Sequence, residues 1–277
     1  MSQLVDLVQW ELGAGTRVVV ARRNLECDDY VDHDLFDPDY TLAGTTGYSL
    51  WEGAAAMSKL LAGDLGTTLR GKRVVELGAG TGLAGLCAAA LGAHVLLTDL
   101  RPVVEGILRN NVTRNTGTAV SGPGAERPAM TPPSTPDGSS RRWQGAVPVG
   151  AGTAAAQPLD WSVPTATQTQ PNDPHDADVV IGADCVFLKE TAEPFAATIA
   201  SLLRSKRKPT AYVAFIDRSR PESKSFASRA DVQRALEDAG CSLEVFHEGP
   251  HDTVDEKNAP IQVQVVVWAI AHLVNGE

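Results

Sequence analysis

The stretch VVELGAGTGLAGL, residues 74–86, joins an apolar run to a glycine-rich turn and then to small apolar residues. A short apolar run that ends at a turn signal is typical of a buried strand. Glycine directly after such a strand lets the backbone come close to a nucleotide ligand. The stretch therefore predicts a strand, a ligand-binding turn and a helix, and it leaves open which nucleotide binds.

Strand-like and helix-like segments alternate around this turn. Further apolar runs lie at 94–100, 178–187 and 209–217, and helical spacing occurs at 49–65, 102–115, 189–206 and about 222–239. The alternation predicts a mostly parallel sheet with helices on both faces. Two more strand-like runs, 241–248 and 261–270, follow with no helix between them. These two runs indicate that the last strand of the sheet is antiparallel.

Two regions stand outside this alternation. Residues 1–46 are acidic and irregular around the strand-like RVVVARR at 17–23, so we expect an N-terminal extension with short strands before a main domain at 47–277. Residues 115–158 hold seven of the 17 prolines amid Gly, Ser, Thr and Ala. Such a composition buries too little apolar surface to offset the entropy of ordering. We predict a low-complexity, partly disordered insertion at about 115–158, with one short strand near its end.

Composition argues against several classes of partner and ligand. A net charge of -10 and a pI near 5.1 argue against binding to nucleic acid, which needs clustered Lys and Arg. No stretch approaches the ~20 apolar residues of a membrane span. The four cysteines form no CxxC pair and the histidines show no ligand spacing, so we expect no metal site and reduced thiols. We expect a monomer in the cytoplasm, with the nucleus as a second location.

Three nucleotide-binding patterns compete for the glycine turn. The dinucleotide pattern GxGxxG would put its third glycine at Leu83, whose side chain would block close packing of helix on strand. A phosphate-binding P-loop needs a GK[ST] ending, which the stretch lacks. An acidic residue followed by GxGxG fits Glu76, Gly78, Gly80 and Gly82. The third pattern therefore describes the turn best.

The third pattern suits a nucleoside ligand that has no pyrophosphate, such as S-adenosylmethionine. Its glycines would let the backbone approach the amino-acid portion, and Glu76 would oppose a positively charged group. Asp99, at the end of the next strand, stands where a carboxylate can accept both ribose hydroxyls. A glycine turn without a ligand is the alternative, but such turns seldom bring both acids with them.

Four segments together resemble one family. GYSLWEGAAAMSKLL (47–61), the glycine turn, LDW (159–161) and ADCVF (183–187) are similar to lysine methyltransferase family 16, the methyltransferase-like 21 group of class I S-adenosylmethionine-dependent protein methyltransferases. The likeness covers roughly residues 45–270 apart from the insertion. It implies a Rossmann-like fold with a seven-stranded, mostly parallel sheet whose last strand is antiparallel.

The resemblance also implies roles for particular residues. S-adenosyl-L-methionine is the expected cofactor and S-adenosyl-L-homocysteine its product. Trp51 is expected beside the cofactor, although a tryptophan on an apolar helix face is often a core residue. Asp184 and Phe187 match the D/E-x-x-Y/F motif beside the target amine, and we predict that they are catalytic. The predicted cofactor-binding residues are Trp51, Glu76, Gly78, Ala79, Gly80, Asp99, Leu100, Asp160, Trp161 and Ala183.

The predicted reaction is methyl transfer to a lysine of a non-histone protein of the chaperone, elongation-factor or ATPase type. In this interpretation Asp184 anchors the ammonium, and Phe187 supplies an aromatic wall that favours cations. Methylation of another protein side chain such as histidine, or of a nucleic-acid or small-molecule amine, stays open. A nucleic-acid amino methyltransferase would carry (D/N)PP(Y/F) where DCVF stands. A non-enzymatic scaffold would be expected to have lost the cofactor residues, which are intact.

Overall fold

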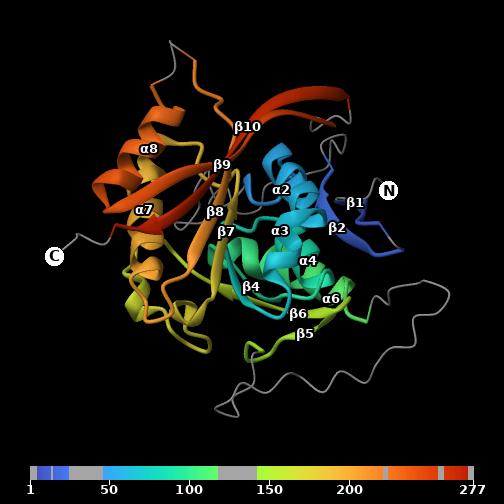
Figure 1. The fold of residues 1–277 in the computed structure, drawn as a ribbon. Coiled ribbons are helices and arrows are strands. Elements are labelled where there is room, and N and C mark those ends of the chain that lie inside the picture. Colours follow the sequence, from blue (N-terminus) through green and yellow to red (C-terminus); the bar gives the residue numbers. More distant parts are fainter. Residues whose placement is uncertain are drawn as a thin grey trace.

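A computed structural model of the chain describes residues 5–13, 15–24, 46–117, 142–220, 224–254 and 259–273. Within these residues, eight strands form one sheet in the order β5-β6-β4-β3-β7-β8-β10-β9, and β1 and β2 form a separate two-stranded sheet (Figure 1). The strands are β1 (Val5–Glu11), β2 (Arg17–Arg23), β3 (Arg73–Leu77), β4 (His94–Asp99), β5 (Val147–Val149), β6 (Gly152–Pro158), β7 (Val179–Ala183), β8 (Thr210–Phe215), β9 (Cys241–Val254) and β10 (Pro260–His272).

Helices cover both faces of this sheet. In Figure 1, α7 and α8 lie to its left and α2, α3 and α4 to its right. The helical segments are α2 (Glu52–Ala62), α3 (Asp64–Leu69), α4 (Leu83–Ala90), α5 (Arg101–Val103), the π-helical turn η2 (Val104–Leu108), α6 (Arg109–Arg114), the 3-10 turns η3 (Thr165–Thr167) and η4 (Pro174–Asp176), α7 (Lys189–Leu203) and α8 (Arg229–Asp238). None of the helices in the described ranges is long and apolar enough to cross a membrane.

The strand directions agree with the sequence-based expectation. β6, β4, β3, β7 and β8 pair in parallel, and β10 is antiparallel to both β8 and β9. The α/β class, the helices on both faces and the antiparallel last strand are therefore confirmed. The sheet has one strand more than the predicted seven, because β5 turns back at Gly150 and adds an antiparallel edge to β6.

Part of the predicted insertion belongs to this sheet. Residues 152–158 form β6, which pairs in parallel with β4 from Thr153 to Pro158, and Trp143 is buried. The sequence GTAAAQP has few residues that favour strands, but its small side chains allow the backbone to lie against its neighbours. A Cβ at Gly152 would lie 2.0 Å from the Ala93 carbonyl oxygen. Residues 118–141 of the predicted insertion lie outside the described residues.

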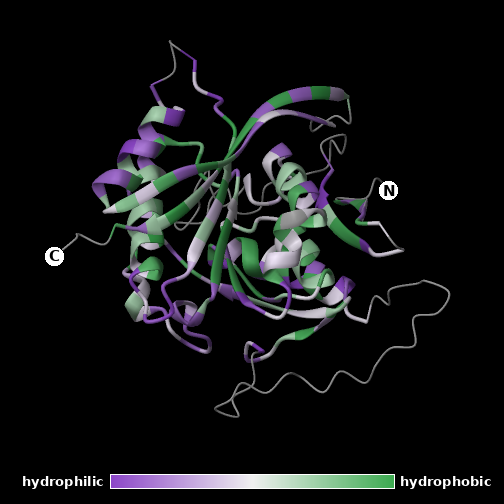
Figure 2. Ribbon diagram, in the orientation of Figure 1, coloured by the Kyte–Doolittle hydropathy of each residue, from purple (hydrophilic) through white to green (hydrophobic). Residues whose placement is uncertain are grey.

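Two hydrophobic clusters lie on the two faces of the sheet. One contains Met57 of α2 and Leu86 of α4 together with Val18 and Val20 of β2. The β1–β2 hairpin therefore packs into the same core as the main sheet, while the predicted division of the chain at residue 46 stays a prediction. The second cluster contains Phe195 of α7 and Trp268 of β10. Figure 2 shows the hydrophobic stretches of the central strands between the two helical layers.

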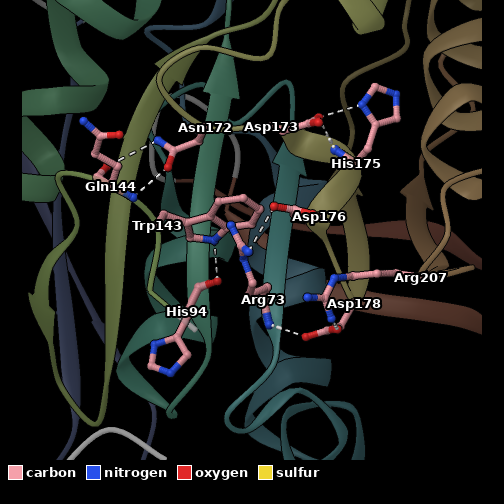
Figure 3. A network of polar contacts seen from close by, with 10 residues as sticks. All are labelled: Arg73, His94, Trp143, Gln144, Asn172, Asp173, His175, Asp176, Asp178 and Arg207. Atoms are coloured by element: carbon pink, nitrogen blue, oxygen red, sulfur yellow. Dashed lines mark hydrogen bonds and ion pairs between the residues drawn. The ribbon is translucent and has the colours of Figure 1, made fainter. Parts of the chain in front are cut away.

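A polar network joins the amino ends of β3, β4 and β7 (Figure 3). The Arg73 guanidinium lies 3.8 Å from the centre of the Trp143 ring and 3.3 Å from the Asp176 carboxylate. Asp178 accepts a hydrogen bond from the Arg73 backbone N–H and pairs with Arg207 at 3.0 Å. The indole N–H of Trp143 donates to the His94 carbonyl oxygen at 2.7 Å. These contacts connect the loops that enter the three strands.

Candidate active site

A cavity of about 340 Å³ opens at the opposite, carboxyl ends of β3, β4, β6 and β7. In open α/β sheets, ligands bind in the crevice outside the carboxyl ends of the strands. The lining residues are Thr46, Gly47, Ser49, Trp51, Ala54, Gly78, Ala79, Gly80, Thr81, Asp99, Leu100, Leu159, Asp160, Trp161, Ser162, Ala183, Asp184, Cys185, Phe187, Glu190, Thr191 and Pro194. Eleven of the twelve residues predicted for the site are among them.

The glycine turn between β3 and α4 forms one wall of the cavity. Gly78, Gly80 and Gly82 all have positive φ, at 60°, 53° and 83°, which residues with a Cβ seldom adopt. A Cβ at Gly78 would lie 2.5 Å from the Cβ of Cys185 and 3.1 Å from the Trp161 ring. The turn therefore depends on glycine both for its conformation and for its close approach to neighbouring strand ends.

Asp99 follows the same turn at the end of β4. Its Oδ2 accepts a hydrogen bond from the Gly80 N–H and its Oδ1 one from the Leu100 N–H, both at 2.7 Å. Burial raises the pKa of Asp99 to about 6, although both hydrogen bonds act in the opposite direction. The two backbone bonds fix the carboxylate, and each oxygen keeps a lone pair with which it can accept a ligand hydroxyl.

Glu76 is the predicted site residue that does not line the cavity. Its side chain lies beneath the glycine turn, where Oε2 accepts a hydrogen bond from the Gly85 N–H of α4 at 3.0 Å. Burial raises the pKa of Glu76 to about 8, so this carboxyl is mostly neutral at pH 7. The geometry ties Glu76 to the first turn of α4, and a contact between Glu76 and a cofactor stays a prediction.

Asp160 and Trp161 form the wall that follows β6. The Asp160 carboxylate accepts hydrogen bonds from the backbone N–H and the hydroxyl of Ser162, at 2.8 and 2.7 Å. The Trp161 ring makes an edge-to-face contact with Phe195, with ring centres 5.1 Å apart. This contact leaves Trp161 half-buried on the cavity wall, where an aromatic ring of a ligand can stack.

The opposite end of the cavity carries the DCVF motif that follows β7. Asp184 has a φ of 58°, which is rare for a residue with a side chain, and its N–H donates to the Ala214 carbonyl oxygen. The Phe187 ring stacks on Trp51 with ring centres 6.2 Å apart and an angle of 20°. Two predicted residues that are 136 positions apart thus form one aromatic wall.

Two charged residues at this end, Arg218 and Glu52, were not predicted from the sequence. The Arg218 guanidinium binds both oxygens of Asp184, with Nη2 to Oδ2 at 2.6 Å, and it also contacts the Glu52 carboxylate. Its Cζ lies 5.2 Å from the centre of the Trp51 ring. The available signal was positional, because Arg218 closely follows β8, whose carboxyl end meets the same edge of the sheet.

In this cavity a glycine turn follows β3 and an acidic residue ends the neighbouring β4, which is the arrangement expected of class I S-adenosylmethionine-dependent methyltransferases. Residues 33–122 and 147–232 match the family described as lysine methyltransferase, which is more than half of the chain. This protein belongs to that family.

Several relatives are similar to parts of this chain. The protein N-lysine methyltransferase METTL21A of Mus musculus is 27% identical over 198 residues, which cover 71% of this chain and 73% of the relative. METTL21A of Danio rerio is 47% identical over 62 residues, 22% of this chain and 28% of the relative. The calmodulin-lysine N-methyltransferase of Arabidopsis thaliana is 27% identical over 140 residues, 50% of this chain and 35% of the relative. The zebrafish and plant alignments therefore span well under half of those relatives.

Proposed function

We propose that this protein is a protein-lysine N-methyltransferase that uses S-adenosylmethionine and releases S-adenosylhomocysteine. The observation that carries the proposal is a single cavity lined by both the glycine turn with Asp99 and the motif of Asp184 and Phe187. The first set suits a nucleoside with an amino-acid portion, and the second suits an amine. Family membership supports the same reaction.

The residues of the cavity fit this cofactor. Asp99 would accept the ribose hydroxyls, and the open backbone at Gly78 and Gly80 would take the amino-acid portion. Trp161 would pack against the adenine, with Asp160 beside it. A volume of about 340 Å³ lies within the range of about 300–1,000 Å³ that is usual for such ligands.

Bound S-adenosylmethionine supplies an electrophilic methyl group, and the chain supplies alignment and a dry environment. A lysine amine has a reference pKa near ~10.4, so it must lose its proton before it attacks. Trp51 and Phe187 form the aromatic wall beside which the target amine would lie. Their rings exclude water and attract the cationic methylated product. Phe187 has no hydroxyl, so it offers the amine no hydrogen bond.

We infer a protein substrate that presents a lysine. Glu190, in the first turn of α7, is exposed and lines the cavity. Its carboxylate suits a basic segment around the target lysine. The plant relative is named for calmodulin and the animal relatives for protein lysine in general, so the identity of the acceptor protein stays open. Three further points stay predictions: the protein is a monomer, it lies in the cytoplasm or nucleus, and it does not bind nucleic acid.

Labelled methyl transfer tests the proposal. Purified protein with tritiated S-adenosylmethionine should label a protein band in a lysate of cells that lack this enzyme, and mass spectrometry should find the methyl group on lysine. Label on histidine, RNA or a small molecule would favour the corresponding alternative.

Substitutions at two positions separate the two halves of the cavity. Asp184→Asn, which keeps a residue tolerant of positive φ, should lose nearly all turnover and still bind the cofactor in calorimetry. Asp184→Ala should behave in the same way if it folds. Asp99→Ala should weaken cofactor binding itself. Unchanged turnover in Asp184→Asn would remove Asp184 from the proposed catalytic set.

A further inference from the structure

The carboxylate of Asp184, which the sequence predicts as the anchor of the amine, is already occupied. Its side chain is only 1% exposed, and Arg218 binds both of its oxygens. The Gly53 N–H donates a third hydrogen bond to Oδ2 at 3.2 Å. Three donors take up three of the about four lone-pair sites of a carboxylate. Because only 1% of the side chain is exposed, little of Asp184 is left within reach of a substrate ammonium.

Arg218 connects the separate parts of the methyl-accepting end. Its guanidinium contacts Asp184, which follows β7, and Glu52, in the first turn of α2. It also lies over Trp51, whose ring stacks on Phe187. A planar guanidinium with five donors in a rigid fork suits two carboxylates and an aromatic face at once better than the compact ammonium group of lysine does.

The charges of this group do not cancel. Arg218 contributes one positive charge, and Asp184 and Glu52 contribute two negative charges. Burial acts to lower the pKa of Arg218, but its hydrogen bonds and charge contacts with the two carboxylates outweigh burial and raise that pKa. Arg218 therefore stays charged, and one negative charge is left over beside the aromatic wall.

We propose that Arg218 is a positioning residue for methyl transfer, anchored by Glu52, which fixes Asp184 and the Trp51–Phe187 wall in one geometry. The remaining negative charge of this cluster favours a cationic acceptor at that end of the cavity. The inference rests on the proposed function. It reassigns Asp184 from direct anchor of the amine to a partner of Arg218.

Substitutions of Arg218 test the inference. Arg218→Met should lower kcat by about 100-fold, the loss expected when reacting groups shift by about 1 Å. The Kd for S-adenosylmethionine, measured by calorimetry, should change less than about threefold, because Asp99 and the glycine turn do not contact Arg218. Arg218→Lys keeps the charge but loses the fork, so its kcat should lie between those of wild type and Arg218→Met.

Two further variants keep the test decisive. Glu52→Gln can still accept a hydrogen bond from Arg218, so it should lower kcat by less than Arg218→Met does. It should also fold even if Arg218→Met fails to fold. Arg229→Met removes an exposed two-bond pair with Glu248, at 2.7 and 3.1 Å, and should keep wild-type turnover. Turnover is expressed per cofactor-binding site in calorimetry, so that unfolded protein does not count.

The results separate this inference from the proposed function. If wild type labels no protein lysine, the proposed function is wrong and the inference falls with it. If wild type labels lysine and the folded Arg218 and Glu52 variants match its kcat, the proposed function stands and the positioning role of Arg218 is wrong. A graded loss from Arg218→Lys to Arg218→Met at constant cofactor affinity supports the positioning role.

Discussion

The parallel strands of the central sheet begin at one side, called here the amino edge, and end at the other, called the carboxyl edge. Each of these edges carries an arginine that lies over a tryptophan and pairs with acidic side chains. At the amino edge, Arg73 lies 3.8 Å from the centre of the Trp143 ring and pairs with Asp176 (Figure 3). At the carboxyl edge, Arg218 lies 5.2 Å from the Trp51 ring and binds Asp184 and Glu52. The same kinds of side chain thus meet at both edges.

The two clusters differ in what surrounds them. Trp143 is 2% exposed, and its indole N–H bonds to the backbone that enters β4. Trp51 is half-buried and lines the cavity together with Phe187. Burial lowers the pKa of Arg73 despite Asp176, whereas two carboxylates raise the pKa of Arg218. The same arginine–tryptophan arrangement connects loops where the protein covers it. Where it borders a cavity, it can hold the side chains of a ligand-binding site in place.

The largest expected effect distinguishes the two tryptophans. Trp143→Ala removes a buried ring and should lower the free energy of unfolding by about 3–5 kcal/mol, as is usual for buried tryptophan. Trp51→Ala should cost less stability, because its ring is half-buried, and should lower turnover strongly. Chemical denaturation and labelled methyl transfer measure the two effects. Equal stability losses and equal turnover losses in the two variants would contradict the division of roles between the edges.

The parts of this structure that local sequence patterns encode could be predicted from the sequence. The apolar strands, the glycine turn and the acid that ends the next strand are local patterns, and the α/β class, Gly78, Gly80 and Asp99 follow from them. The other predicted residues that line the cavity came from the resemblance to a known family. The short strand predicted near the end of the 115–158 insertion lies where the structure has β6. Its alanines and glycine did not indicate that this strand lies inside the main sheet. Its place depends on the neighbouring backbone of β4 and the turn at Ala93.

Arg218 escaped prediction for a related reason. It lies 34 residues from Asp184 and 166 from Glu52 in the chain, so no local spacing connects the three. Glu76 shows the reverse case. Its place at the end of an apolar strand predicts a residue that contacts the cofactor, which stays a prediction. The structure adds a contact that the sequence did not indicate, because β3 is buried on both faces and the Glu76 side chain bonds to α4.

A second prediction concerns the pH dependence of cofactor binding, and it tests whether the carboxyl edge is the one that binds the ligand. Burial raises the pKa of Asp99 to about 6, so the free protein loses the ionised carboxylate as pH falls through that value. The ionised form accepts ribose hydroxyls best, and cofactor binding should therefore weaken at low pH. From pH 7.5 to pH 5 the Kd for S-adenosylmethionine should rise about tenfold.

Calorimetry over this pH range measures the effect, and Asp99→Asn is the matched control. The amide does not titrate, so this variant should bind weakly with a Kd that is nearly independent of pH. If the variant shows the same pH dependence as wild type, another group is responsible and Asp99 is not the ribose acceptor.

The smallest expected effect concerns Glu190, at the rim of the cavity. Asp99, Asp160 and Asp184 each accept hydrogen bonds or pair with a cation, whereas the structure shows no such partner for Glu190 within its described residues. An exposed carboxylate contributes about 0.2–1 kcal/mol to an ion pair, so Glu190→Gln should raise the KM for a protein substrate about threefold and leave kcat unchanged. High salt should reduce the difference, because it screens exposed charges.

Glu193→Gln, one turn further along α7, is the control for a general loss of surface charge. An equal rise in KM in both variants would mean that overall charge attracts the substrate, and a fall in kcat in Glu190→Gln would move Glu190 from the rim to the reacting end of the cavity.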